Sequence, residues 1–486
     1  MQAISTNKPI ETRFFMVLGL VTALAVWGAI LLDEVLLLGL PFLLILGYQT
    51  VVNYYSIYIL LFATLPLSTE IYFNNGLSTD LPSEPLMIGL MLVYGLQVLS
   101  RPDTIDGRFW KHPLTLLLGL HVCWTAFATI LSANQVISIK FLLAKIWYIV
   151  PFFFLTGHLM RHEQKIWRLW WWIMIPLTLA TFKVIAHHAV LDFGFKEINR
   201  ATSPFFRNHV SYAAILAQSI PLLWFFWARY KRFTMRWNIL AICMSILFFG
   251  MLTTYTRAAY VAIVLAIGAY VVIQYKMMRY ALFAGALVVG LFFTYMANNN
   301  KFMDYAPSER TIAHEEFGDI VAATYKMEDV STSERYYRWI GGIRMSQVDP
   351  ITGFGPGCFH SYYKGYTLNS FSTYVSANPE KSGIHNYFLM LLAEQGWPGM
   401  LFFIALVFYT LILGEKVYHQ SKSKDRKLLA MGLLLLLVVI DSFLLMNDMI
   451  ETDKVGSFFF FSMAILINLD IRNRKEQQSE ELTEKT

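Results

Sequence analysis

Between residues 428 and 446 the chain reads LLAMGLLLLLVVIDSFLLM, an apolar run with one charged residue, Asp441. A helix over this run is about 28 Å long, which matches the ~30 Å hydrocarbon core of a bilayer. About fourteen apolar runs of this kind occur along the chain. We therefore predict an all-α, polytopic integral membrane protein with about 12–14 transmembrane helices and one large external loop.

The apolar runs are separated by polar breaks, most of them short. The break between the second and third runs is Asn53 alone, which leaves the number of spans open. The candidate spans cover residues 14–32, 35–52, 54–68, 85–99, 113–131, 141–158, 169–190, 209–228, 238–254, 257–274, 280–297, 385–413, 428–446 and 455–469.

The composition excludes several other classes of protein. Apolar residues make up 56% and charged residues 15% of the chain, against roughly 45–50% and about 25% in an ordinary globular protein. A soluble enzyme, a disordered protein and a secreted disulfide scaffold are therefore excluded. Cys123, Cys243 and Cys358 form no metal-ligand spacing and no disulfide framework. The net charge of +6 is spread over short loops and gives no nucleic-acid signal.

The basic residues predict the orientation in the membrane. The basic N-terminus leads into an apolar run without a small-residue cleavage site, which indicates a retained first span. The short loops at 33–34 and 69–84 contain acidic residues and no Lys or Arg. If spans alternate from a cytoplasmic N-terminus, more than half of the 39 Lys and Arg residues lie inside. These inner segments are 1–13, 100–112, 159–168, 229–237, 275–279, 414–427 and 470–486.

This orientation divides the chain into four parts. Residues 1–297 hold the first eleven candidate spans, 298–384 an external loop, 385–469 the last spans and 470–486 a cytoplasmic tail. Within the loop, Ser331 to Glu334 form a capping box that predicts a helix through about Gln347. A long loop of this kind is more often functional than not. The charged end of the chain, which lacks aromatic residues, is expected to be disordered.

Two arginines at the predicted outer ends of spans are candidate anion-binding residues. Arg207 begins the eighth span, and its planar guanidinium suits bidentate binding of a phosphate. The alternative is an arginine that anchors the helix at the membrane interface. Arg257 lies where two spans meet, next to the hydroxyls of Thr253 to Thr256. This cluster can bind an anionic oxygen, or it can be a turn packed against headgroups.

Five further candidates come from the loop, the start of the twelfth span and the start of the sixth span. Arg335 and Arg338 are three residues apart and therefore lie on one helical face; the alternative is a solvated basic face. His385 precedes the span, and a histidine can exchange a proton near neutral pH, although a lone histidine is usually a structural cap. Lys140 and Lys145 flank the outer start of the sixth span and are expected to add positive charge.

Sequence motifs for cofactors are absent. The chain has no GxGxxG, Walker A, HExxH or GxSxG motif. Gly353, Gly355 and Gly357 follow no predicted strand, so a nucleotide site is not expected. The loop has no acidic cluster of the divalent-cation type. We therefore expect neither a cofactor nor a metal.

Taken in order, these segments resemble the O-antigen ligase and O-antigen polymerase superfamily of bacterial envelope enzymes. The last two elements of the resemblance are the most specific: P-I-x-G-x-G-x-G, and H-N-aromatic followed by E-x-G-x-x-G. Asn208-His209 stands where many members have proline-asparagine. The resemblance covers roughly residues 140–415, through the stretches 203–212, 254–259, 333–339, 350–357 and 384–399.

The resemblance implies a membrane-embedded glycosyltransferase that needs no metal. Such enzymes take a glycan from an undecaprenyl-diphosphate carrier at the external face of the bacterial inner membrane and attach it to an acceptor hydroxyl. The acceptor is lipid A–core in ligases and a carrier-linked saccharide in polymerases. The resemblance also implies that the donor diphosphate is bound by Arg207 and Arg257, with Arg335 and Arg338. It further implies that His385 serves or orients the acceptor hydroxyl. Possible supporting residues are Asn386, Thr256 and Lys145.

Several alternatives stay open at this point. Ligase, polymerase and protein O-oligosaccharyltransferase share the donor, and the ligase label is favoured because of the motif order. A transporter of lipid-linked saccharide would place its charges near the bilayer midplane, in interrupted helices and repeated halves. A scaffold protein of envelope assembly would use a basic rim to bind lipid headgroups.

Overall fold

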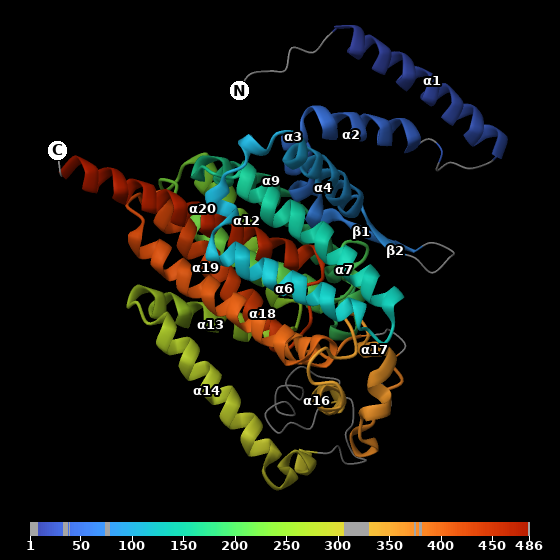
Figure 1. The fold of residues 1–486 in the computed structure, drawn as a ribbon. Coiled ribbons are helices and arrows are strands. Elements are labelled where there is room, and N and C mark those ends of the chain that lie inside the picture. Colours follow the sequence, from blue (N-terminus) through green and yellow to red (C-terminus); the bar gives the residue numbers. More distant parts are fainter. Residues whose placement is uncertain are drawn as a thin grey trace.

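The computed structural model describes residues 8–32, 37, 39–72, 78–305, 330–373, 376–378 and 382–484. Parts of several predicted segments lie outside these residues, among them the cytoplasmic N-terminus, the outer loops at 33–34 and 69–84 and the external loop at 298–384; the side chain of Ser331 in the capping box is also outside the description. Figure 1 shows a bundle of long helices, with α16 and α17 at one end and the C-terminus at the other.

The first part of the chain contains α1 (Lys8–Leu32), α2 (Leu40–Val52), α3 (Tyr54–Thr64), η2 (Leu65–Leu67), β1 (Thr69–Tyr72), β2 (Ser78–Leu81), α4 (Ser83–Ser100), η3 (Pro102–Thr104), α5 (Gly107–Trp110), α6 (Pro113–Ile130), α7 (Gln135–Ile149), η4 (Val150–Leu155) and α8 (Thr156–Leu159). The middle part contains α9 (Glu163–Val190), η5 (Phe195–Glu197), α10 (Ile198–Thr202), α11 (His209–Ala228), α12 (Met235–Leu252), α13 (Arg257–Gln274), α14 (Met278–Ala297) and η6 (Asn298–Tyr305). The last part contains α16 (Val330–Val348), α17 (Phe359–Tyr362), η7 (Tyr363–Tyr366), η8 (Asn369–Phe371), α18 (Tyr387–Gln420), α19 (Lys424–Leu444) and α20 (Asp453–Glu484).

The architecture confirms the predicted all-α membrane fold. Among the described residues, eleven helices are long and apolar enough to cross a membrane, and three shorter apolar helices lie near the N-terminus. The strands β1 and β2 form one short antiparallel pair. In a bilayer a helix satisfies its backbone polar groups by itself, which is why each apolar run folds as one.

The core of the bundle lies around α19 and α20. Helix α19 packs against α11, α13 and α18, and 94% of the apolar window of α20 is buried. Helix α14 contacts the bundle through α13 and α18, and 6% of its window is buried; in Figure 1 it diverges from the other helices. The elements that position the candidate site therefore meet at the central helices.

Two of the long helices are locally irregular. A π-helical segment, η4, joins α7 to α8 and contains Pro151. Helix α18 is interrupted at Gly396, whose φ of 66° and ψ of −172° are not helical. Pro151 lacks a backbone N–H, and Gly396 tolerates a positive φ, so each residue type permits the irregularity that occurs there.

Helix α16 confirms the helix predicted from Ser331 to Gln347, because it extends from Val330 to Val348. The chain end differs from the prediction. Residues 470–484 continue α20 and are not disordered, and polar contacts hold them to neighbouring helices. The prediction of disorder was wrong because the charges of this segment have partners on other helices, which sequence composition does not reveal.

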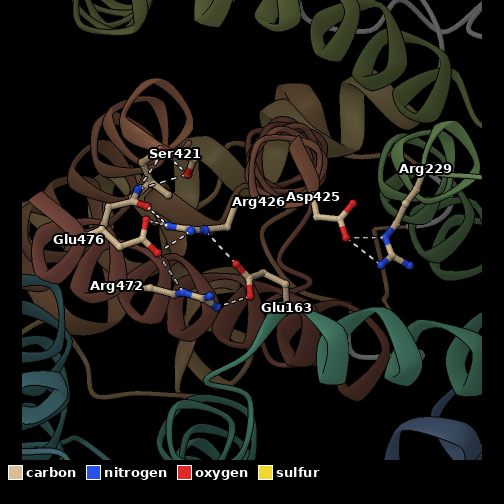
Figure 2. Close-up of polar contacts among 9 residues, drawn as sticks. Glu163, Arg229, Ser421, Asp425, Arg426, Arg472 and Glu476 are labelled. Carbon is tan, nitrogen blue, oxygen red and sulfur yellow. Dashed lines mark hydrogen bonds and ion pairs between the residues drawn. The ribbon is translucent and has the colours of Figure 1, made fainter. Parts of the chain in front are cut away.

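Figure 2 shows these partners at the end of the bundle near the C-terminus. The guanidinium of Arg426 lies 2.8 Å from Glu163 Oε1 and 2.7 Å from Glu476 Oε1. Arg472 also pairs with Glu163. These side chains are called the inner ion-pair cluster below. Its members come from α9, α19 and α20, so the cluster ties three helices together.

Candidate active site

The start of α18 is fixed by Asn386. The Asn386 side chain accepts a hydrogen bond from Leu389 N at 3.0 Å, as an N-cap, and donates one to Leu445 O at 3.1 Å. Asn386 therefore joins the beginning of α18 to the end of α19. Its supporting role in the site stays a prediction, but its position next to His385 is firmly defined.

His385 precedes this cap with a φ of 58°. A positive φ is uncommon outside glycine, and such residues are frequent at functional sites. Burial, together with the charges of Arg338 and Arg335, lowers the pKa of His385 to about 3, against a smaller opposing effect of the hydrogen bond with Asn447. The imidazole is therefore neutral near pH 7 and available as a hydrogen-bond acceptor.

Arg338 lies under the segment that carries His385. Its guanidinium donates to Ser382 Oγ at 2.9 Å and Gly383 O at 3.1 Å, and lies 3.3 Å from Glu334 Oε2. The side chains of Arg338 and Glu334 are buried. The alternative of a solvated basic face does not hold for Arg338, because this residue connects α16 to the backbone before His385.

Arg335 lies three positions before Arg338 on the same helix and is partly exposed. Its charge acts on the His385 imidazole. The two loop arginines therefore stay candidates for different roles. Arg335 is accessible to a ligand, whereas the hydrogen bonds of Arg338 are made within the protein.

Lys145 reaches the site from α7. Its ammonium group donates to Glu451 Oε1 at 2.9 Å and to the Tyr387 hydroxyl at 3.2 Å. The Tyr387 hydroxyl donates to the same carboxylate oxygen at 2.6 Å. Lys145 is buried, whereas Lys140 is exposed. Lys145 thus belongs to the candidate site, and its positive charge is balanced by Glu451.

The glycine-rich turn packs against the interruption of α18. Backbone N–H groups of Gly357 and Phe359 donate to the Glu394 carboxylate at 2.8 and 2.9 Å. Trp397 N donates to Pro350 O at 2.9 Å. The two most specific motifs of the sequence therefore form one joint between the loop and α18.

Glycine is required in this joint for steric reasons. Gly353, Gly355, Gly357 and Gly396 have positive φ. A Cβ on Gly396 would lie 2.1 Å from Ile351 O, and a Cβ on Gly353 would lie 2.4 Å from the backbone carbon of Glu394. Glycine at these positions is therefore required by the packing of the turn against α18.

Arg207 is exposed and lies in the turn before α11. Asn208 caps this helix, because its side chain accepts a hydrogen bond from Ser211 N at 2.9 Å. His209 donates from its backbone N to Asn199 Oδ1 at 2.9 Å. Asn208 and His209, which depart from the superfamily pattern, thus hold the turn without a proline at that position.

Arg257 is the first residue of α13, and Thr256 is its N-cap residue. The Thr256 hydroxyl donates to Thr254 O at 3.3 Å, and the Thr254 hydroxyl donates to Met251 O at 2.7 Å. These two hydroxyls stabilise the turn that carries Arg257. A role for Thr256 toward a ligand stays a prediction.

Residues 242–404 match the sequence pattern of a family described as O-antigen ligase. The match covers 163 of the 486 residues, and this region is similar to that family. No curated protein matches the chain. The family supports a glycosyltransferase-like enzyme of the ligase or polymerase type in a multi-pass membrane protein.

The matched region extends from α12 into α18. It contains Arg257, both loop arginines, His385 and Asn386, whereas Arg207 and Lys145 lie outside it. Helices α11 and α7, which place these two residues, pack against the bundle around this region. The predicted site residues therefore include two that lie outside the matched region.

The sequence analysis missed the segment between α19 and α20, residues 445–452. Asn447 and Asp448 lie beside His385 and Gly383, and Glu451 binds Lys145. Burial raises the pKa of Asp448, and the charge of Arg338 acts against this shift. A signal was available, because N-D-M-I-E-T-D-K places four charges between two apolar runs on the predicted outer side. The spacing alone did not show that these residues face His385.

Proposed function

We propose that the protein is an outer-face glycosyltransferase that moves a glycan from an undecaprenyl-diphosphate carrier to an acceptor hydroxyl, with lipid A–core as the acceptor. The observation that carries the proposal is the neutral, positive-φ His385, held beside Arg335 and Arg338 within an O-antigen ligase family domain. The alternatives within the same chemistry are a polymerase and a protein O-oligosaccharyltransferase.

In the proposed reaction, the acceptor oxygen forms a bond to the anomeric carbon of the glycan. The bond from that carbon to the phosphate oxygen breaks, and the electron pair leaves with undecaprenyl diphosphate. Arg207 and Arg257 bind the diphosphate and stabilise the charge that develops on it. Arg335 adds a positive charge on the side of the site that binds the diphosphate. Arg338 is buried and stabilises the same negative charge from a greater distance. Arginines in this role make a metal unnecessary.

His385 accepts a hydrogen bond from the acceptor hydroxyl and orients its oxygen toward the anomeric carbon. A low pKa makes the imidazole a weak base, so orientation of the hydroxyl comes first. As the new bond forms and the hydroxyl becomes acidic, its proton passes to the His385 imidazole, which then releases it to solvent. Asn386 fixes the backbone next to His385 through its contact with Leu445. The site therefore needs a precise backbone geometry more than a strong base.

We infer an external active site and cytoplasmic termini in the bacterial inner membrane from the distribution of basic residues. The length of α20 is that expected if its two polar ends lie at opposite membrane surfaces. Asp453, near the candidate site, and Arg472, in the inner ion-pair cluster, lie on the same helix about 28 Å apart. This separation corresponds to the thickness of a hydrocarbon core.

The proposal is tested by the surface polysaccharide of a deletion strain, separated by size. Loss of long chains from a surviving core, with accumulation of carrier-linked polymer, supports the ligase. A core that carries a single repeat unit indicates the polymerase instead. Complementation with Arg257→Ala or His385→Ala, inserted at normal levels, is expected to reduce product by at least a hundredfold. Full product from both variants would contradict the transferase proposal.

A further inference from the structure

Lys454 is a buried lysine at the start of α20 that has no assigned role in the proposed reaction. Its ammonium group donates to Ser68 O at 2.9 Å and to Phe205 O. The same group lies 5.0 Å from the ring centroid of Phe206. Phe205 and Phe206 directly precede Arg207, so the lysine holds the backbone that carries this arginine.

Charged neighbours offset part of the cost of burying this ammonium group. The carboxylates of Asp453, Asp80 and Glu70 lie close enough to favour its positive charge. Asp453 in turn accepts hydrogen bonds from Ser68 Oγ at 2.7 Å and Ser83 Oγ at 3.2 Å. The start of α20 is therefore tied to the end of η2 and to the start of α4.

A second lysine also holds the residues before Arg207. The Lys183 ammonium group donates to Ser203 O and lies 5.8 Å from the Phe205 ring centroid. After Arg207, the Asn208 side chain accepts a hydrogen bond from Ser211 N at 2.9 Å. With its backbone held by contacts before and after it, the exposed Arg207 side chain starts from a defined position.

We propose that Lys454 is a positioning residue for the donor site: its ammonium group donates a hydrogen bond to the Phe205 carbonyl and thereby holds Arg207 in the position in which it binds the diphosphate of the carrier lipid. The inference rests on the proposed function. A hydrogen bond from a charged donor to a backbone carbonyl is directional, and loss of such a contact lets the turn relax. A small displacement of a group that binds a charged ligand reduces its effect strongly.

The test is binding of undecaprenyl diphosphate to the purified full-length protein in lipid nanodiscs, with undecaprenol as a second probe. Lys454→Met is expected to weaken diphosphate binding about tenfold or more, with binding of undecaprenol unchanged. Lys454→Arg, which keeps the charge and donors, is expected to restore part of the affinity. In an Arg207→Ala background, Lys454→Met is expected to have no further effect, because the two residues act as one unit.

The outcomes separate the inference from the proposed function. If Arg207→Ala itself leaves diphosphate binding intact, the proposed donor site fails. If Arg207→Ala weakens binding but Lys454→Met does not, or if the two effects add, the positioning role fails. Equal weakening of undecaprenol binding would also overturn it, since that result indicates a general structural defect. If Lys454→Met does not fold, Lys454→Gln is measured, and Arg426→Met serves as the control for loss of a distant buried cation.

Discussion

At the scale of single residues, the candidate site combines a neutral acceptor with positive charge that is largely balanced. His385 is neutral because it is buried beside two arginines. Arg338 is paired with Glu334, and Lys145 with Glu451. A site of this kind keeps its cations in place before a ligand arrives, which is the condition for electrostatic preorganisation.

The lowered pKa of His385 predicts a pH dependence of stability. In the unfolded chain a histidine takes up a proton below about pH 6.5, whereas folded His385 stays neutral down to about pH 3. The contribution of His385 to the free energy of unfolding is therefore fully present above about pH 6.5, and it is lost as the pH falls toward 3. Between pH 7.5 and 4.5, the melting temperature of His385→Gln is expected to fall less steeply with decreasing pH than that of the native protein. Identical slopes would contradict the low pKa.

The pair between Lys145 and Glu451 predicts a coupling between α7 and the segment before α20. Lys145→Met is expected to destabilise the protein by on the order of 3 kcal/mol, because it leaves the carboxylate without its cation. The double variant Lys145→Met/Glu451→Gln is expected to recover part of this loss. Melting temperatures from size-exclusion measurements give the comparison; simple additivity of the two single effects would show that the residues are not coupled.

At the scale of elements, the interruption of α18 positions the site. The short first segment of this helix starts at the Asn386 cap and ends at Gly396, where the glycine-rich turn fits. Glu394 binds two backbone N–H groups of the loop. The break in α18 therefore serves as the attachment of the loop to the bundle, and His385 is held between α16 and α19.

Gly396→Ala is expected to disrupt this attachment. The positive φ costs an alanine on the order of 1–3 kcal/mol, and the clash with Ile351 O adds to this cost. Gly268→Ala in α13 is the matched control, because nothing lies within 4 Å of a Cβ there, and a helical alanine gains up to about 1 kcal/mol. The yield and melting temperature of both purified variants check the prediction. Equal behaviour would show that the joint does not depend on glycine.

At the scale of the whole molecule, two polar layers bound the apolar bundle. One contains the candidate site and the start of α20, and the other contains the inner ion-pair cluster (Figure 2). Each layer joins helices that are far apart in the sequence. Partners at both ends restrict the tilt of α20, which is the most buried of the spans.

The inner ion-pair cluster predicts a stability effect without an effect on catalysis. Arg426→Met is expected to destabilise the protein by about 3–5 kcal/mol, since Glu163 loses a partner in a buried network. Arg229→Met is the matched control, because the pair of Arg229 with Asp425 is more exposed, and such pairs contribute up to about 1 kcal/mol. Melting temperature and product per folded molecule are measured together. Loss of activity per folded Arg426→Met molecule would show that the two layers are coupled.

The spans were predictable because each apolar run must satisfy the bilayer by itself. The sequence predicted the run at 428–446, which α19 confirms as Lys424–Leu444, and the loop helix, which α16 confirms. The order of short motifs was enough to indicate the O-antigen ligase family. These properties depend on residues that are neighbours along the chain, so hydropathy, capping and motif spacing determine them.

Only the tertiary structure decided which charges meet. Lys145 and Glu451 are 306 residues apart, and Lys454 and Phe205 are 249 apart. It also showed that α20 continues to Glu484 and that the glycine-rich turn fits the break in α18. A buried charge is stable only when its partner is placed by the packing of other helices. That packing is a property of the whole bundle, and no local pattern in the sequence encodes it.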